Sequence, residues 1–233
     1  LSLKIMFLYY VAIWPALYLL LNSSNVWYNS PAGEINDLKI KRNSMAFFHT
    51  CIAVTISFLY YLYPDTYVGI KGPFSYNEKL FNFSYSYFIW DTYLIATNYF
   101  KKEKMFIYHH LVTLYILELI RYSPESRIIN NIFMVGELSN LTFYPVYHYM
   151  KLIQPKSNDP MKDNYIYKTL KKFRIIQSFW YITLRFFIFS YFIYIYSDKI
   201  SDKFMLYNLY GVYLLGVGWS FNNIKGVYLD YFY

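Results

Sequence analysis

The chain has 233 residues, of which 57% are hydrophobic, 24% aromatic and 15% charged, with a single cysteine and a net charge of +8. Because soluble domains carry roughly 25% charged residues, this composition argues against a soluble domain, and one cysteine excludes an internal disulfide framework or thiolate metal site. The positive charge gathers in loops beside apolar runs, which is typical of membrane proteins and gives no reason to predict a nucleic-acid partner.

Seven apolar segments follow one another along the chain, most of them about 17–25 residues long, the length that crosses a bilayer. A lipid-exposed backbone must satisfy its own hydrogen bonds, and continuously apolar runs of this length are typical of helices rather than barrel strands. We therefore predict an all-α polytopic membrane protein with about seven transmembrane helices. The first, within residues 1–25, has no cleavage pattern and is interpreted as a retained leading helix. The segments are Leu3–Leu21, Ser44–Tyr63, Leu80–Phe100, Met105–Tyr122, Ile128–Tyr149, Phe173–Tyr196 and Phe204–Leu229.

Lysine and arginine are unevenly distributed between the two ends of the predicted bundle. The loops after the first, third and fifth spans, with the C-terminal end, hold about twice as many as the opposite loops, and such residues favour the cytosolic side. We therefore predict a luminal or external N-terminus and a cytosolic C-terminus, in the endoplasmic reticulum or another endomembrane, or in a host membrane if the source is viral. Glycosylation of the sequon at Asn22 would contradict this orientation.

Ionisable residues inside the predicted spans carry the main functional signal. A charge at mid-bilayer costs a few kcal/mol, so such residues usually face the interior of the bundle. Their depth in the membrane follows from their distance along the helix to the nearest cytosolic basic residue, at a rise of about 1.5 Å per residue. Most of them lie in the cytosolic half or near the midplane, which predicts one polar cavity open to the cytosol. They are His49, Asp91, His109, His110, Glu118, Glu137 and Arg185, with Ser139, Asn140 and Asn222 among their softer polar neighbours.

Helical spacing arranges several of these residues in stripes on single helix faces. Interhelical hydrogen bonds that only hold the bundle together would produce the same stripes, and spacing alone leaves that alternative open. The stripes are Ser84, Tyr87, Asp91 and Asn98 on the third span, Glu137, Asn140, Tyr144 and His148 on the fifth, and Gln177, Tyr181 and Arg185 on the sixth.

Six short stretches, in this order along the chain, match the motifs of a known family. They are Arg42–His49, Phe88–Asp91, Tyr108–Thr113, Glu137–Ser139, Arg185, and Trp219–Asn222 followed by Lys225 and Gly226. Together they resemble the TLC-domain family, which includes the ceramide synthases and a branch of uncharacterised TLC-domain-containing proteins. The resemblance covers residues 40–230 and implies a six-helix ring around a central cavity, preceded by one further helix.

The resemblance also implies roles for individual residues. In the ceramide-synthase branch the paired histidines support N-acyl transfer from acyl-CoA to a sphingoid amine. Carried over, His109 is the candidate acyl carrier or general base, with His110 and Asp91 orienting or polarising it. The ceramide synthases have a pair of aspartates where this chain has Glu137 and Ser139, a pattern that, with His49, is similar to the uncharacterised branch. The remaining cavity or lipid-binding candidates are His49, Glu137, Ser139, Asn140, Arg185 and Asn222.

Two functions stay open at this point. The chain either binds membrane lipids and influences their composition or trafficking, or is an acyl-CoA-dependent lipid N-acyltransferase that uses His109 and His110; whether it is an enzyme is not decided. A metal-dependent lipid oxidase is disfavoured because adjacent histidines are poorly spaced for one ion, and nothing selects ion transport. We predict no metal and no cofactor, acyl-CoA being a candidate substrate, and membrane lipids as partners; the oligomeric state is unknown.

Overall fold

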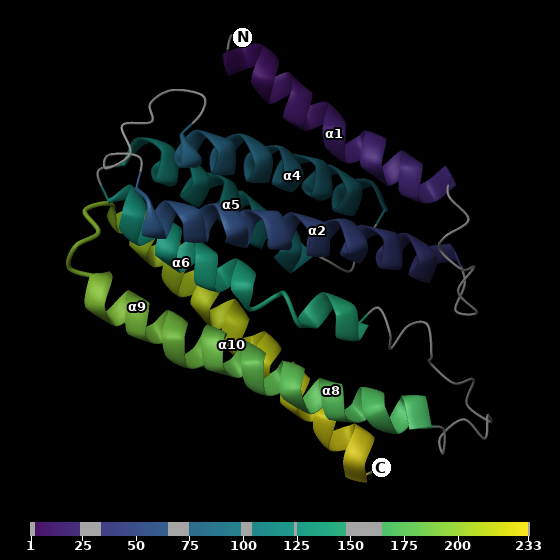
Figure 1. Cartoon of the computed structure of the whole chain (residues 1–233). Helices are drawn as coiled ribbons and strands as arrows, with labels where there is room; N and C mark the ends of the chain where they lie inside the picture. Colours follow the sequence, from purple (N-terminus) through teal and green to yellow (C-terminus); the bar gives the residue numbers. More distant parts are fainter. Residues whose placement is uncertain are drawn as a thin grey trace.

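The computed structural model of the chain describes residues 3–23, 34–64, 75–98, 104–123, 125–147 and 165–232. Within these ranges every regular element is a helix, as the predicted all-α class requires, and the helices run roughly along one direction (Figure 1). They are α1 (Leu3–Ser23), α2 (Glu34–Leu62), α4 (Tyr76–Asn98), α5 (Lys104–Tyr122), α6 (Ser126–Leu138), α8 (Tyr165–Ile182), η3 (Thr183–Ile188), α9 (Phe189–Tyr196) and α10 (Lys203–Phe232).

The distribution of apolar and polar side chains fits a bundle surrounded by lipid. Large apolar side chains such as Phe179, Tyr194 and Leu214 are exposed, whereas Asn82 and Asn130 are fully buried. Soluble proteins bury the first kind and expose the second. Two helical stretches, Lys39–Leu62 and Lys168–Tyr196, are long and apolar enough to cross a membrane, and Phe7–Leu20 is a shorter apolar helix. The count of seven spans stays a prediction.

Contacts between helices follow one another in a closed order. α2 contacts α4, α4 contacts α5, α5 contacts α10, and α10 contacts α8, η3 and α9. α6 contacts both η3 and α9 and returns to α2, while α1 lies outside and packs on α4 and α2 (Figure 1). α6 also contacts α5 across this order. This order supports the six-helix ring, which stays a prediction.

The outer helix α1 is fixed by one fully buried tryptophan. The Trp14 indole N–H donates to the Ser86 hydroxyl at 2.9 Å, and its ring meets that of Tyr87 edge-on, with centroids 5.0 Å apart. Burial of such a ring is a large apolar contribution, and the satisfied N–H removes the penalty of burying its polar end. α1 is therefore attached to the side of α4 that also faces the interior.

The fifth predicted span, Ile128–Tyr149, is not one continuous helix. α6 ends at Leu138, residues 139–142 form turns, and helical structure resumes at 143–147. Pro145 explains the break, because it has no N–H and its ring clashes with the carbonyl four residues earlier, whereas the first turn of a new helix tolerates it. The prediction of one continuous helix over this segment was wrong. The last two residues of the segment lie outside the described ranges.

Parts of three predictions fall outside what the structure describes. They are the side chain of Asn22 and residue Ser24 of its sequon, the basic loop between residues 148 and 164, and the side chain of Asn98 in the polar stripe of the third span. The predicted orientation in the membrane stays a prediction.

The loop before α10 joins three helix ends. The Asp202 carboxylate caps α10 by accepting from the Met205 amide at 3.0 Å, and it also accepts from the Tyr115 hydroxyl of α5. Nearby, Glu125 accepts from the hydroxyls of Ser123 and Ser201. These carboxylates fix the end of the bundle that is remote from the cavity described below.

We expect Asp202→Ala to lower the free energy of unfolding by about 1–2 kcal/mol, because it removes a helix cap. The hydrogen bonds from Tyr115 and Met205 hold the pKa of Asp202 below its usual range. The contribution is therefore fully present above the unfolded pKa of about 3.9 and is lost as pH falls through the lowered folded value. Thermal unfolding in detergent measures both effects. Asp198→Ala, an equal charge change at an exposed residue, is the control, and an equal loss there would contradict the cap.

Candidate functional site

A cavity of about 240 Å³ lies inside the bundle, between the first half of α2, the second half of α4, the start of α5 and the second half of α10. All of the predicted site residues except Ser139 line it, and Ser139 lies behind one of them. The lining set is His49, Asp91, His109, His110, Glu137, Asn140, Arg185 and Asn222. Asn222 is exposed and so marks the rim. Side chains from separate helices thus meet in one chamber, which interhelical bonding alone does not require.

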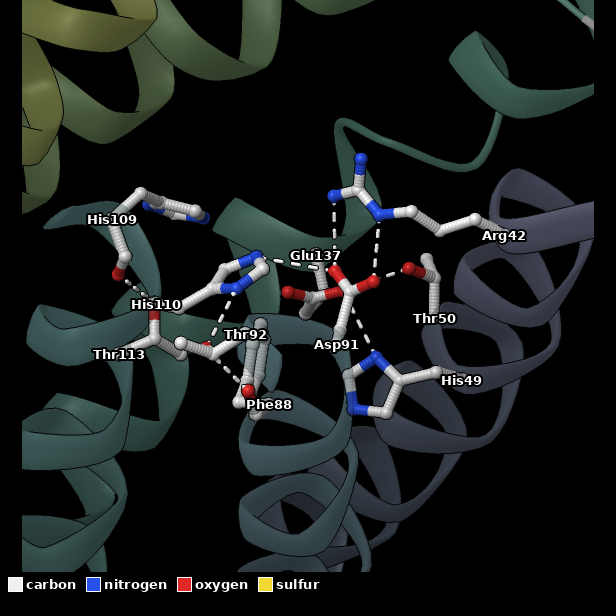
Figure 2. A network of polar contacts seen from close by, with 10 residues as sticks. All are labelled: Arg42, His49, Thr50, Phe88, Asp91, Thr92, His109, His110, Thr113 and Glu137. Carbon is white, nitrogen blue, oxygen red and sulfur yellow. Dashed lines mark hydrogen bonds and ion pairs between the residues drawn. The ribbon is translucent and has the colours of Figure 1, made fainter. Parts of the chain in front are cut away.

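The centre of the site is an ion pair between α2 and α4. Arg42 donates to Asp91 twice, from Nε to Oδ1 at 2.6 Å and from Nη2 to Oδ2 at 3.0 Å (Figure 2). Both side chains are at most one tenth exposed. Two parallel charge-assisted hydrogen bonds of this kind fix geometry as well as charge, so Asp91 is held in one position.

His110 is held from two sides. Its Nε2 lies 3.4 Å from Asp91 Oδ2, and its Nδ1 lies 3.1 Å from the Thr92 hydroxyl (Figure 2). Thr92 also donates to the Phe88 carbonyl. The imidazole therefore extends the ion pair from α4 to α5, and its ring is not free to turn towards a ligand.

His49 and Glu137 form a second network. Glu137 Oε2 accepts from the Thr50 hydroxyl at 2.7 Å and lies 3.7 Å from His49 Nδ1. The other ring nitrogen of His49 lies 3.0 Å from the Ser84 hydroxyl, and the ring stacks on Tyr87 with centroids 4.0 Å apart. This network links α2, α4 and α6 across the floor of the cavity.

His109 differs from His49 and His110, the other two histidines of the cavity. Its Nδ1 is buried without a hydrogen-bond partner, and its ring meets the edge of Trp219, with centroids 5.9 Å apart. In Figure 2 its ring stands apart from the Asp91 network. Within the described residues Asp91 contacts Arg42 and His110. A direct contact between Asp91 and His109, which would orient the His109 ring, is not seen there.

Arg185 lies in a π-helical turn, η3, between α8 and α9. Such turns are frequent at functional sites because they shift the register of the helix by one residue. Arg185 donates from Nε to Ser139 at 2.7 Å and from Nη2 to the Gly136 carbonyl at 2.9 Å. Trp180 donates to the Leu138 carbonyl at 3.1 Å. The broken end of α6 is therefore capped by side chains from the neighbouring helix, which satisfy carbonyls that the break leaves open.

The sequence interpretation missed part of the site. Arg42 was counted among the loop charges, whereas it lies inside α2 and is buried. Its spacing of seven residues from His49 puts both on one helix face and was the available signal. Thr50 and Thr92 gave no signal, because hydroxyls are common in apolar helices. Within the described ranges no three His, Cys, Asp or Glu side chains gather as a metal site would require.

We expect Asp91→Asn to lower the stability by about 3 kcal/mol, because Arg42 would remain buried without its counter-charge. Thermal unfolding in detergent measures the change. The double variant Arg42→Gln/Asp91→Asn removes both charges and should recover part of the loss. If the stability loss of the double variant equals the sum of the losses of Asp91→Asn and Arg42→Gln, the two residues are not coupled and this interpretation is contradicted.

The chain matches the family model described as the TLC domain over residues 39–224. No curated protein and no solved structure matches it. The matched stretch contains every residue that lines the cavity and covers well over half of the chain. This chain therefore belongs to the TLC domain family, whose members are generally membrane proteins linked to lipid metabolism.

Proposed function

We propose that the chain binds a membrane lipid in its cavity without transforming it, and thereby influences lipid composition or trafficking. The observation that carries this proposal is the state of the cavity's polar groups. Asp91 and Glu137 both have partners within the protein, as do His49 and His110. Both ring nitrogens of His49 and of His110 face protein atoms. These two imidazoles therefore shape and polarise the chamber but have no nitrogen left to exchange a proton with a ligand.

The size and walls of the cavity suit part of an amphipathic molecule. Its volume of about 240 Å³ lies just below the range of about 300–1,000 Å³ typical of ligand sites. A headgroup and the beginning of one chain fit that volume, and the rest of the lipid extends past the rim. Aromatic side chains form much of the wall, and their apolar faces and polar edges suit both parts of a lipid. They include Tyr87, Phe106, Tyr144 and Trp219.

The position of the cavity supports access from one side of the membrane. It lies towards the start of α2 and the end of α10, the end at which α8 carries Lys171, Lys172 and Arg174. Under the predicted orientation this end faces the cytosol of an endomembrane. We propose that lipids enter there.

His109 favours one alternative, an acyl-CoA-dependent N-acyltransferase. Its unpartnered Nδ1 leaves the imidazole available as a general base. In that reaction the lipid amine attacks the thioester carbonyl, the carbon–sulfur bond breaks, and the imidazole takes the amine proton and passes it to the departing thiolate. The thioester and the amine both come from the substrates, so no further reactant is needed.

A cavity-filling variant tests lipid binding. We expect Ala46→Phe, at a buried cavity position, to abolish co-purified lipid, because the ring occupies the space that the lipid needs. Mass spectrometry of lipids extracted from washed, purified protein measures the retained amount. Ala96→Phe, the same change at an exposed site, is the control and should retain lipid. Asn43→Phe, at a less buried cavity position, replaces Ala46→Phe if that variant does not fold. Undiminished lipid in the folded variants would refute binding in this cavity.

The two histidines separate binding from catalysis. His109→Ala should keep the stability of the parent, because His109 Nδ1 has no hydrogen bond. His110→Ala should lower it by about 1–3 kcal/mol, since it leaves Asp91 and Thr92 short of a buried partner. Acyl transfer from acyl-CoA to a long-chain amine is measured in nanodiscs. If the chain only binds lipid, the parent and His109→Ala should show the same background rate of acyl transfer. Turnover that disappears in folded His109→Ala would establish the alternative.

A further inference from the structure

Arg185 is a buried cation without a carboxylate partner. The side chain is only 3% exposed, and its hydrogen bonds go to two neutral acceptors, Ser139 and the Gly136 carbonyl. The other arginine of the cavity, Arg42, is paired with Asp91 at 2.6 Å. Among the described residues, no Asp or Glu oxygen is recorded within 4.0 Å of Arg185.

The nearest acid along the chain does not supply the missing charge by contact. Glu137 follows Gly136 directly and attracts Arg185 through space, but its carboxylate accepts from Thr50 and lies beside His49. A buried charge without a counter-ion in contact is less stable than one in a direct ion pair. An anion that entered the cavity would therefore gain more at Arg185 than at Arg42, whose charge is already balanced.

The guanidinium is held in place by bare backbone on two sides. A Cβ atom added at Gly216 of α10 would lie 3.3 Å from Arg185 Cδ, and one at Gly136 would lie 3.9 Å from Nη1. The two hydrogen bonds use Nε and Nη2, and no hydrogen bond from Nη1 is recorded in the described part of the chain. A fixed guanidinium with donors to spare is the arrangement that binds carboxylate or phosphate groups.

A small recess adjoins the main cavity at Arg185. It measures about 30 Å³, shares His109, Glu137 and Arg185 with the main cavity, and is otherwise mostly apolar, with Ile132 and Phe189 in its wall. It is too small for an acyl chain. A lipid therefore lies in the larger cavity, where Arg185 and His109 form part of the wall.

We propose that Arg185 receives the anionic group, a phosphate or a carboxylate, of the lipid that occupies the cavity. This inference rests on the proposed lipid binding and adds the chemical class of the ligand. The unpartnered Nδ1 of His109 lies in the same wall and is available for a second hydrogen bond. Arg42 and Asp91 shape the opposite wall and take no part in the selection of charge.

The experiment compares ligands on the full chain purified in uncharged detergent. Binding of phosphatidic acid, oleate, inorganic phosphate and an uncharged diacylglycerol with the same acyl chains is titrated by native mass spectrometry. We expect phosphatidic acid or oleate to bind at least about tenfold more tightly than the diacylglycerol. Arg185→Gln should remove this preference, and Arg185→Lys, which keeps the charge without the planar fork, should retain part of it.

A matched control separates the binding role from the structural one. Trp180→Phe removes the other side-chain bond to the end of α6, at a residue that does not line the cavity. Like Arg185→Gln, it removes a hydrogen bond to a carbonyl at the end of α6, but it should keep the preference for anionic lipid. If Arg185→Gln does not fold, Gly216→Ala, whose Cβ displaces the Arg185 stem, should weaken anionic lipid binding several-fold.

The outcomes distinguish this inference from the function beneath it. If none of the lipids binds, the proposed lipid binding fails. If the diacylglycerol binds as tightly as the anionic lipids, or the preference survives in folded Arg185→Gln, the assignment of Arg185 fails while lipid binding stands. If inorganic phosphate binds as tightly as phosphatidic acid, the ligand is a free anion and the lipid source is wrong.

Discussion

The burial of charge inside an apolar bundle is the constraint on which the rest of the structure depends. Arg42 and Asp91 come from α2 and α4, and each is tolerated inside the bundle only because the other is there. His110 adds α5 to the same network through Asp91. Three helices are therefore held in one register by charge, in surroundings where apolar contacts between helices have little directional preference. The cavity exists where this register leaves space between them.

The same logic applies to the break in α6, although there the exposed groups are backbone carbonyls. Pro145 prevents a continuous helix. The Gly136 and Leu138 carbonyls beside the break accept from Arg185 and Trp180, in addition to the Ser139 hydroxyl and the Leu141 amide. The end of α6 and the cation of the site are therefore joined by direct hydrogen bonds.

The sequence predicted the site better than it predicted the shapes of the helices. Asp91, Glu137 and the two adjacent histidines were found because ionisable residues in apolar runs are costly and face inward. Hydropathy reports how apolar a segment is and carries no information on interruptions of a helix. The turns at 139–142 and the π-helical turn around Arg185 were therefore not predicted. Arg42 was misplaced because a basic residue at the start of an apolar run is usually a flanking charge. Its pairing with Asp91 depends on two distant helices, and no local pattern carries that information.

The contrast between His109 and His110 connects structure to function. Adjacent residues on a helix point about 100° apart, so a pair that looks like one motif in the sequence serves two environments. His110 faces α4 and completes the charge network, whereas His109 faces α10 and the cavity with a nitrogen unused. A site with one histidine fixed and one free can hold a ligand by His109 without disturbing the fold that depends on His110. Under the proposed function and under its alternative alike, the ligand would meet the imidazole of His109, and the two proposals differ in whether that imidazole takes a proton from it.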